Sequence, residues 1–438
     1  MNYFNLLSKI KLERITRWYD LPHIYQYSAF FIKIPKIIRE KSLGKLNKNK
    51  ISGVGTSFLS KRKAKLRAIY ELLERFALAY IDKQDVFKQK VSQLRDEDKS
   101  FLKKFLDEKD IFYLTKINPR FNNFIPQNND SLYFTYAIDI INRKKILIPA
   151  QLIYVPDKFI DKKILREPNS TGAAAGENLY YCLVKGILEI FERDAFMIYY
   201  LNGFFGERID INKYFKYQNL LKKIQRYKLE LYVFHLPSDF HVFNIVALIL
   251  DRSGQLPIVN CGSCSGFDAQ YCILKSIEEA LQVAQWIRYI KSFNNHLNFK
   301  YDLNKLEERG LFWCDLSKRQ YIEKLIKSST SKNNHFIYLE KYFNKLGIKS
   351  FNYRKLFRFL VKEIRDKNFD LLYKEITPEF FKKNKVRIIK TIIPQVQHIY
   401  LGEDFKYINI ERLNILKKFK FIDNRRKTTI NYIPHFFL

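Results

Sequence analysis

The chain has 438 residues, of which 47% are hydrophobic and 28% are charged, so it can bury a large core as one domain or as two closely packed ones. A formal net charge of +33 would normally indicate nucleic acid or an anionic membrane as a partner. Here the cations are scattered along a chain that is also rich in Asn, Ile, Tyr and Phe, so we expect neither. No apolar run is long enough to cross a bilayer and the amino terminus lacks a signal-peptide core, which predicts a cytoplasmic protein.

Taken in order, the chain begins with a basic lead-in over residues 1–50 and continues as one domain over 51–438. Strand-like runs and helical stretches are interleaved without strict alternation, which predicts an α+β fold. Residues 83–130 and 300–375 are charged and largely helical in pattern. Phe30–Ile34 is a weak strand signal. The clearer strand predictions are Leu132–Asp139, Ile146–Val155, Glu230–His235, Val242–Leu250, Pro257–Asn260 and Val386–Ile393.

Three segments of small residues, each followed by a helical stretch with acidic side chains, form the most informative pattern. The segments are Gly53–Ser57, Ser170–Gly176 and Gly262–Gly266. The helical stretches carry Glu71 and Glu74, then Glu189 and Glu192, and finally Glu279 and Gln282. We expect each segment to be a loop that presents backbone N–H groups to phosphate. Side chains three apart on a helix share one face, so each pair is expected to point the same way.

The first acid of each helical stretch lies about 16 or 17 positions after a glycine of its segment. This repeated spacing predicts that the three helices converge on one cavity. Neighbouring carboxylates repel one another unless a cation lies between them, and Mg²⁺ bound to phosphates is a suitable cation. The alternative is three ordinary amphipathic helices whose acids are solvated separately.

Other polar residues give weaker signals. Arg193 has two equally supported roles, contact with phosphate or pairing with Asp194 or Glu189, and Lys275 and Arg288 are further phosphate candidates. Five cysteines do not suit a disulfide framework, and no convincing Ser-His-Asp or Cys-His constellation is present. Phosphoryl transfer is compatible with this, because it requires positioning and charge neutralisation rather than a protein nucleophile.

The three blocks, Gly53–Arg75, Ser170–Asp194 and Gly262–Gln282, resemble those of the YcaO family, ATP-dependent enzymes that modify backbone amides of peptides. The middle block is the most specific, because STGAAAG, GILEIFERDAFM and their spacing match together. The resemblance implies a YcaO-like catalytic domain over 51–438, with mixed sheets and three loop–helix units that converge on one ATP and Mg²⁺ site. The Mg²⁺ ligands that it implies are Glu71, Glu74, Glu189, Glu192 and Glu279. The further ATP contacts are Ser170, Thr171, Gly172, Arg193, Lys275, Gln282 and Arg288.

Within the family, the chain most resembles the branch that makes thiazolines and oxazolines in ribosomally made peptides. In that chemistry a Cys, Ser or Thr side chain attacks the preceding amide carbonyl, the oxyanion takes the γ-phosphoryl group of ATP, and phosphate leaves. The tail Pro434–Leu438 resembles a proline-rich ending of this branch with one proline left, and it makes His435 a candidate catalytic group for proton transfer. Two departures are Val54, where the family commonly has lysine, and Arg67, where a small residue is usual.

Two other functions stay open. One is backbone thioamide formation at the same ATP site with an external sulfur source, and the other is a non-catalytic scaffold that docks a peptide or a modifying enzyme. The intact carboxylates favour an enzyme, because buried acid clusters are costly to keep without a cation. The resemblance implies two partners, a ribosomal precursor peptide and a second protein that captures its leader. It is also compatible with a flavin dehydrogenase as a further partner and with a homodimer.

Overall fold

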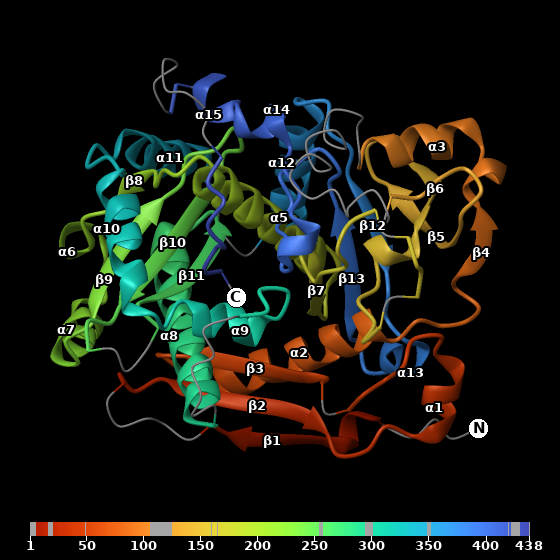
Figure 1. Cartoon of the computed structure of the whole chain (residues 1–438), viewed down its shortest axis with the longest axis horizontal. Helices are drawn as coiled ribbons and strands as arrows, with labels where there is room; N and C mark the ends of the chain where they lie inside the picture. Colours follow the sequence, from red (N-terminus) through yellow and green to blue (C-terminus); the bar gives the residue numbers. More distant parts are fainter. Residues whose placement is uncertain are drawn as a thin grey trace.

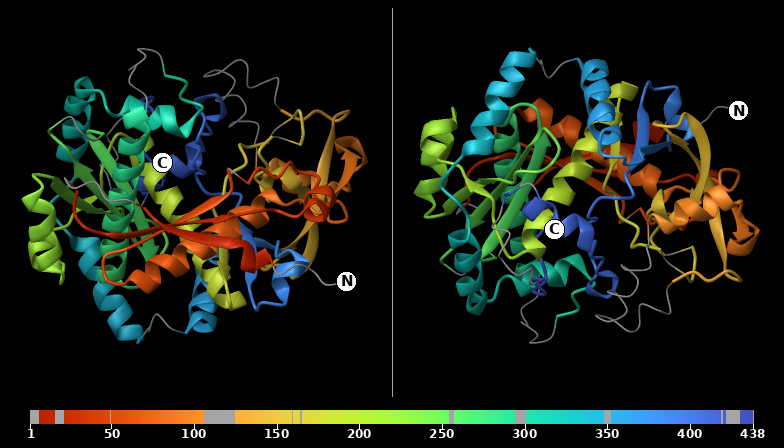
Figure 2. Two further views of the ribbon diagram at one scale, coloured as in Figure 1. Left: turned by 90° about the horizontal axis from the view of Figure 1, so that it is seen from below. Right: turned by 90° about the horizontal axis from the view of Figure 1, so that it is seen from above.

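The computed structural model describes residues 6–15, 21–48, 50–105, 125–158, 160–163, 165–253, 257–293, 301–347, 352–418, 420–421 and 430–437. Within them the chain forms three antiparallel sheets, each with one long helix packed against it (Figure 1). Helix α5 (Leu179–Leu201) runs through the middle of the molecule between two of the sheets, and the remaining sheet, formed by the amino-terminal strands, lies across both halves (Figures 1 and 2). The predicted α+β fold is confirmed.

The first sheet has the order β1 (Ile10–Arg14), β2 (Tyr25–Phe31), β3 (Ser52–Ser57), and helix α2 (Lys61–Ala79) packs on it. Helix α2 begins where the Ser60 hydroxyl accepts the Lys63 N–H at 3.3 Å, which satisfies one of the free N–H groups of the first turn. The helix buries Ala68 and Leu72 next to β3. The weak strand signal at Phe30–Ile34 overlaps the end of β2. Because β2 pairs with β3, the boundary predicted at residue 50 lies inside one sheet.

The second sheet has the order β4 (Phe87–Lys90), β5 (Ser131–Asp139), β12 (Leu372–Glu375), β13 (Arg387–Ile392), β7 (Ala173–Gly176), and β6 (Lys144–Pro149) also pairs with β5. Helix α5 packs against β7 and β13. The strands predicted at Leu132–Asp139 and Val386–Ile393 are confirmed. The strand predicted at Ile146–Val155 stops at Pro149, where the chain enters a 3₁₀ turn (Ala150–Leu152).

The third sheet has the order β11 (Val259–Gly266), β10 (Phe243–Leu250), β9 (Glu230–His235), β8 (Glu207–Arg208), and helix α8 (Ala269–Phe293) packs on β11 and β10. Every residue of β10 is buried, which agrees with its apolar side chains on both faces. The strands predicted at Glu230–His235 and Val242–Leu250 are therefore confirmed.

Shorter helices complete the fold, and several of them lie on the outside of the molecule (Figure 2). They are α1 (Lys36–Lys41), α3 (Asp96–Lys103), α6 (Ile211–Tyr214), α7 (Gln218–Arg226), α9 (Leu306–Phe312), α10 (Arg319–Lys327), α11 (Asn334–Leu346), α12 (Tyr353–Arg365), α13 (Glu379–Lys382), α14 (Ile410–Leu413) and α15 (Ile415–Lys418). The helical pattern predicted for 300–375 is present, whereas part of the stretch 83–130 lies outside the described residues. Among the described helices, none combines the length and apolar character needed to cross a membrane.

Most of the small-residue segments are strands rather than loops, which corrects the sequence prediction, whereas Ser170–Gly172 precedes β7 as a turn. Gly53–Ser57 forms most of β3, the three alanines and Gly176 form β7, and Gly262–Gly266 ends β11. A Cβ atom at Gly55 would collide with the Ala64 carbonyl oxygen of α2, and one at Gly262 with the Ser276 carbonyl oxygen of α8. Small residues are therefore needed in β3 and β11 because these strands lie directly against the backbone of their helices.

Candidate functional site

A cavity of about 670 Å³ lies where α2, α5 and α8 meet. Its lining includes Glu71 of α2, Glu189 of α5 and Glu279 of α8. The prediction that the three acidic helices converge on one cavity is therefore confirmed, and the alternative of three separately solvated acid clusters is wrong.

The same hydrogen bond holds the first acid of each helix. Strands β3, β7 and β11 lie at the edges of their sheets, and an edge strand has backbone N–H groups that no neighbouring strand uses. One N–H in or next to each strand donates to a glutamate Oε2 at 3.0 Å. The three pairs are Val54 with Glu71, Gly172 with Glu189, and Ser263 with Glu279. The repeated spacing in the sequence is thus the length of chain that closes this hydrogen bond.

Gly172 shows why one of these units requires glycine. Its φ of +86° lies in the left-handed region, and a Cβ atom there would collide with the Thr391 carbonyl oxygen. This conformation accompanies the hydrogen bond from the Gly172 N–H to Glu189. We expected such N–H groups to bind phosphate, but the three described above bind carboxylates. The backbone therefore positions the acids.

The second polar residue of α2 and of α8 also reaches the cavity. Glu74 and Gln282 line it, and Gln282 Oε1 accepts a hydrogen bond from Thr56 Oγ1 at 3.0 Å. Burial, followed by the charges of Glu189 and Glu71, raises the pKa of Glu74 to about 8. Glu74 is therefore largely protonated at neutral pH in the absence of a cation.

Glu192, the second acid of α5, is placed differently. It is not among the residues that line the cavity, and its carboxylate accepts hydrogen bonds from the Ser265 N–H at 3.0 Å and from the Ser263 hydroxyl. Burial raises the pKa of Glu192 to about 7, although the charge of Arg193 opposes this. Glu192 thus connects α5 to β11, and its role as a Mg²⁺ ligand stays a prediction.

The raised pKa of Glu74 predicts how the free energy of unfolding depends on pH. The folded state holds the Glu74 proton more tightly than the unfolded state, so this stabilisation is complete below the ordinary pKa of 4.5 and is lost as pH rises through about 8. Glu74→Gln should therefore match the wild type at pH 4 and exceed it by about 1–3 kcal/mol at pH 9. Urea unfolding at a series of pH values measures this difference. Parallel stability curves for the two proteins would contradict it.

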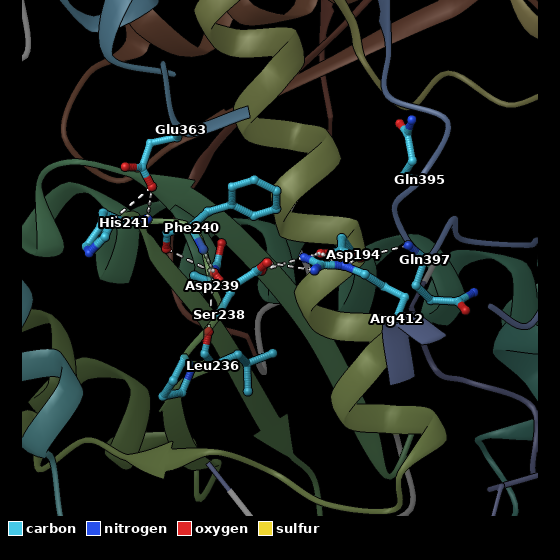
Figure 3. Close-up of polar contacts among 12 residues, drawn as sticks. Asp194, Leu236, Ser238, Asp239, Phe240, His241, Glu363, Gln395, Gln397 and Arg412 are labelled. Atoms are coloured by element: carbon cyan, nitrogen blue, oxygen red, sulfur yellow. Dashed lines mark hydrogen bonds and ion pairs between the residues drawn. The ribbon is translucent and has the colours of Figure 1, made fainter. Parts of the chain in front are cut away.

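Arg193 lines the cavity and pairs with Glu189, which is one of its two predicted roles, and its contact with phosphate stays a prediction. Its guanidinium lies 3.5 Å from a Glu189 oxygen and 3.3 Å from a Glu192 oxygen, and it lies over the ring of Phe437 at 3.9 Å. Asp194 is not its partner. Figure 3 shows Asp194 facing Arg412 of α14, whose Nη2 approaches Asp194 to 2.6 Å.

The remaining predicted site residues divide into those that line the cavity and those that do not. Ser170, Thr171 and Lys275 line it, and Arg288 does not. His435 is fully buried and lies outside the lining, and its Nε2–H donates to the Tyr400 carbonyl oxygen at 2.7 Å. Burial lowers the pKa of His435 well below its ordinary value, so the ring stays neutral. In this placement His435 anchors the tail, and its catalytic role stays a prediction that the burial does not favour.

Two further residues of the site were missed or undervalued by sequence analysis. Lys390 of β13 is 3% exposed and donates to the carbonyl oxygens of Asn169 and Thr171, each at 2.6 Å. Burial lowers the pKa of Lys390 to about 8, although the charges of Glu189 and Glu74 oppose this. A single lysine in the otherwise apolar run IIKTII was the available signal. Arg67, noted as a departure from the family pattern, lines the cavity and pairs with Glu278 at 2.5 Å.

A comparison with protein families identifies the chain. The sequence model described as YcaO cyclodehydratase, ATP- and Mg²⁺-binding, matches residues 55–397, which is more than half of the chain. The chain belongs to the YcaO family. The resemblance seen in the three blocks is thus confirmed, and the predicted cofactors ATP and Mg²⁺ are those of the family.

Solved structures of YcaO proteins share the fold of this chain. A heterocyclase in complex with substrate and cofactor has a TM-score of 0.69 and 16% identity, covering 98% of this chain and 55% of its own. YcaO from Methanopyrus kandleri bound with AMPPCP and Mg²⁺ has a TM-score of 0.58 and 13% identity, covering 92% and 89%. The E. coli microcin synthetase McbBCD complex gives a TM-score of 0.57 and 11% identity, covering 88% of each chain. This YcaO chain thus spans about half the length of the heterocyclase. A search of curated proteins found no match.

The donor groups of the cavity fit the cofactors of the YcaO family. Mg²⁺ prefers oxygen ligands, keeps several waters, and usually takes one or two protein carboxylates together with substrate phosphates. The cavity offers the carboxylates of Glu71, Glu74, Glu189 and Glu279. In the part of the chain that the structure describes, no three His, Cys, Asp or Glu side chains form a cage for a metal ion. A cation shared between protein and nucleotide suits this arrangement.

Proposed function

We propose that this YcaO protein uses ATP and Mg²⁺ to cyclise a Cys, Ser or Thr side chain of a ribosomally made peptide onto the preceding amide. The product would be a thiazoline or an oxazoline. The observation that carries the proposal is the convergence of Glu71, Glu189 and Glu279, each held by a backbone N–H, on one cavity. Such an arrangement serves the positioning and charge neutralisation that phosphoryl transfer requires.

The cavity lining does not favour covalent catalysis by the protein. Its cysteine Cys261 is buried, and burial raises the pKa of the thiol well above its ordinary value, so a reactive thiolate is disfavoured. Among the described residues, no histidine lines the cavity. The nucleophile is therefore assigned to the peptide substrate.

When bound, ATP would supply the phosphoryl group that converts the amide oxygen into a leaving group, and Mg²⁺ would neutralise its phosphates. The substrate side chain loses its S–H or O–H proton, the amide nitrogen loses its N–H proton, and the carbonyl oxygen leaves within phosphate. The peptide thus loses one water for each ring, while ATP becomes ADP and phosphate.

The residues of this chain divide into those that face the ligands and those that position them. We assign Glu71, Glu74, Glu189 and Glu279 to Mg²⁺. We assign Ser170, Thr171, Lys275 and Gln282 to the nucleotide. Gly172 and Lys390 would be positioning residues. The Gly172 N–H donates to Glu189, and Lys390 donates to the two carbonyl oxygens on either side of Ser170.

We also propose that a second protein assists the chain by binding the precursor peptide. One solved relative is a microcin synthetase complex, and it has also been solved with pro-MccB17 bound. A partner that holds the peptide at the site would convert a bimolecular step into an effectively intramolecular one.

The test combines the chain with ATP, Mg²⁺, a Cys/Ser/Thr-containing precursor peptide and the partner, and then measures the mass of the peptide. Loss of one water per modified residue, with one ADP formed for each, is the expected result. Replacement of oxygen by sulfur in the presence of a sulfur donor would support thioamide formation instead. Binding of peptide without ATP turnover would support the scaffold function.

A further inference from the structure

A second hollow, with a volume of about 460 Å³, lies beside the first sheet and shares no lining residue with the cavity at α2, α5 and α8. Three stretches of chain form it: the residues that follow β2, helix α1, and the segment that leads into β3 (Figure 1). Four of the seven described residues that line it are cations, and none is an acid. The cations are Lys33, Arg39, Lys45 and Lys48, and we call this surface the basic groove.

The floor of the basic groove is apolar and well packed. Ile34 and Leu46 line it, are 4% and 8% exposed, and belong to the core that α2 forms with the first sheet. Two other isoleucines of this region face the solvent instead, because Ile32 is 54% exposed and Ile37 of α1 is 55% exposed. Each of these two lies within two positions of a groove cation in the sequence. The region therefore offers positive charge and apolar surface together.

The four cations of the basic groove have no acidic partner. In the part of the chain that the structure describes, none of their side chains forms an ion pair or a hydrogen bond. Two acids next to these stretches are already engaged, since Glu40 pairs with Lys36 at 3.6 Å and Asp157 pairs with Lys50 at 2.6 Å. A hollow lined by charges of one sign concentrates its field on a ligand of the opposite sign. The basic groove thus favours an anion.

The apolar surface beside the basic groove distinguishes between classes of anion. A phosphate chain or a nucleic-acid backbone would use the charges but would leave the exposed isoleucines in water. An anionic membrane would suit a protruding surface, whereas these cations line a hollow with a buried floor. A peptide segment that combines acidic and apolar side chains would use both the charges and the isoleucines.

The basic groove is close enough to the cavity for one peptide to reach both. Lys48 lines the groove and Val54 lines the cavity, and the two are only six positions apart in the sequence. A chain spans at most about 3.6 Å per residue, so the Cα atoms of Lys48 and Val54 are at most about 22 Å apart. An extended peptide stretch of about seven residues covers this distance.

We propose that the basic groove binds an acidic and apolar segment of the precursor peptide, outside the residues that are cyclised, while the reacting side chain enters the cavity. This inference rests on the proposed function and adds to it a peptide-binding site on this chain and the charge of the segment that it takes. Holding one part of the peptide raises the effective concentration of the reacting part at the cavity. The groove acts on peptide binding and not on ATP, because no described residue lines both hollows.

The first test measures binding of a fluorescein-labelled peptide of alternating glutamate and leucine to the full chain by fluorescence anisotropy. The wild-type protein should bind it, and added NaCl should weaken the binding because salt screens the attraction. The variant with both Arg39→Gln and Lys45→Gln should bind at least about tenfold more weakly, because it loses two charge-assisted contacts. Ile37→Ser should weaken binding about threefold to tenfold without a change of charge. Lys222→Gln with Lys223→Gln, on the exposed face of α7, is the matched control and should bind as the wild type does.

Further controls identify the ligand and exclude a loss of fold. Arg39→Lys with Lys45→Arg keeps both charges and should stay within about threefold of the wild type, and thermal unfolding of each variant checks the fold. Unchanged binding by the double glutamine variant would overturn the inference, and so would equal binding of a peptide of alternating glutamine and leucine. Tighter binding of a single-stranded oligonucleotide or of phosphatidylserine vesicles than of the acidic peptide would overturn the assignment to a peptide.

A second test separates this inference from the proposed function. It uses a precursor peptide with an acidic segment about seven residues from the modified residue, together with ATP, Mg²⁺ and the partner. The variant with both Arg39→Gln and Lys45→Gln should raise the KM for this peptide at least about fivefold and leave kcat and peptide-free ATP hydrolysis unchanged. Glutamine in place of the acids of the peptide should abolish the difference between the variant and the wild type. Ring formation with an unchanged KM defeats this inference alone, whereas groove binding without any ring formation defeats the proposed function alone.

Discussion

Glu189→Gln is expected to abolish ATP hydrolysis by this YcaO protein while leaving its fold intact. The glutamine keeps the side-chain oxygen that accepts the Gly172 N–H, but it removes the charge that we assign to Mg²⁺. Burial raises the pKa of Glu189, so its charge is unfavourable in the cavity without a cation. The free energy of unfolding without ligand should therefore be unchanged or slightly higher. Phosphate release and urea unfolding measure the two effects.

Glu189→Ala separates the two contributions of this side chain. It removes the charge and also leaves the Gly172 N–H without an acceptor, which should lower the free energy of unfolding by about 1–3 kcal/mol. Both variants should be inactive, and the alanine variant alone should be less stable. Glu379→Gln, which disrupts an exposed ion pair with Lys382, is the control and should behave as the wild type does. Normal ATP hydrolysis by Glu189→Gln would disprove the assignment of Glu189 to Mg²⁺.

The convergence of the acids could be predicted from the sequence because it depends on a local relation. The 16- or 17-residue spacing is the distance along the chain from an edge-strand N–H to the glutamate that it holds. The same hydrogen bond recurs three times, so the pattern repeats in the sequence even though the three units differ in most side chains. A local rule of this kind needs no knowledge of how the sheets are arranged.

The strand character of the small-residue segments could not be predicted in the same way. Runs such as Ala173–Gly176 have low β propensity and resemble loops. They form a strand because β13, more than 200 residues further along the chain, pairs with β7, and because α5 packs closely against it. Tertiary packing therefore overrides local preference at these positions.

Long-range pairing also explains why Lys390 and the partner of Asp194 were missed. Arg412 is 218 positions from Asp194, and Lys390 is 221 positions from Asn169. The sequence predicted an ion pair between Asp194 and Arg193 as one alternative, because adjacent opposite charges are the simplest pairing when the fold is unknown. In the structure Arg193 lines the cavity, whereas Asp194 is buried and pairs with Arg412. The two adjacent charges therefore have different partners.

Arg412→Ala is expected to be the most destabilising single substitution among those considered. Figure 3 shows Arg412 between Asp194 and Asp239, and its Nη2 lies 2.6 Å from one carboxylate and 2.7 Å from the other. Each of the three side chains is at most 4% exposed. Removing the guanidinium would leave two buried carboxylates facing each other, which should lower the free energy of unfolding by about 3–5 kcal/mol. Urea unfolding at neutral pH measures the loss.

Two causes could contribute to that loss of stability: the uncompensated charge of the two carboxylates and the loss of packing around the Arg412 side chain. A change of pH and a second substitution distinguish them. Without Arg412 the two carboxylates would hold protons more tightly than in the unfolded chain, so the deficit of Arg412→Ala should shrink as pH falls towards 4. Adding Asp239→Asn to the same variant should recover part of the loss at neutral pH. Lys382→Ala breaks an exposed ion pair and should change the free energy of unfolding by less than about 0.5 kcal/mol. A deficit that is independent of pH and not relieved by Asp239→Asn would assign the role of Arg412 to packing, because uncompensated charge responds to both changes.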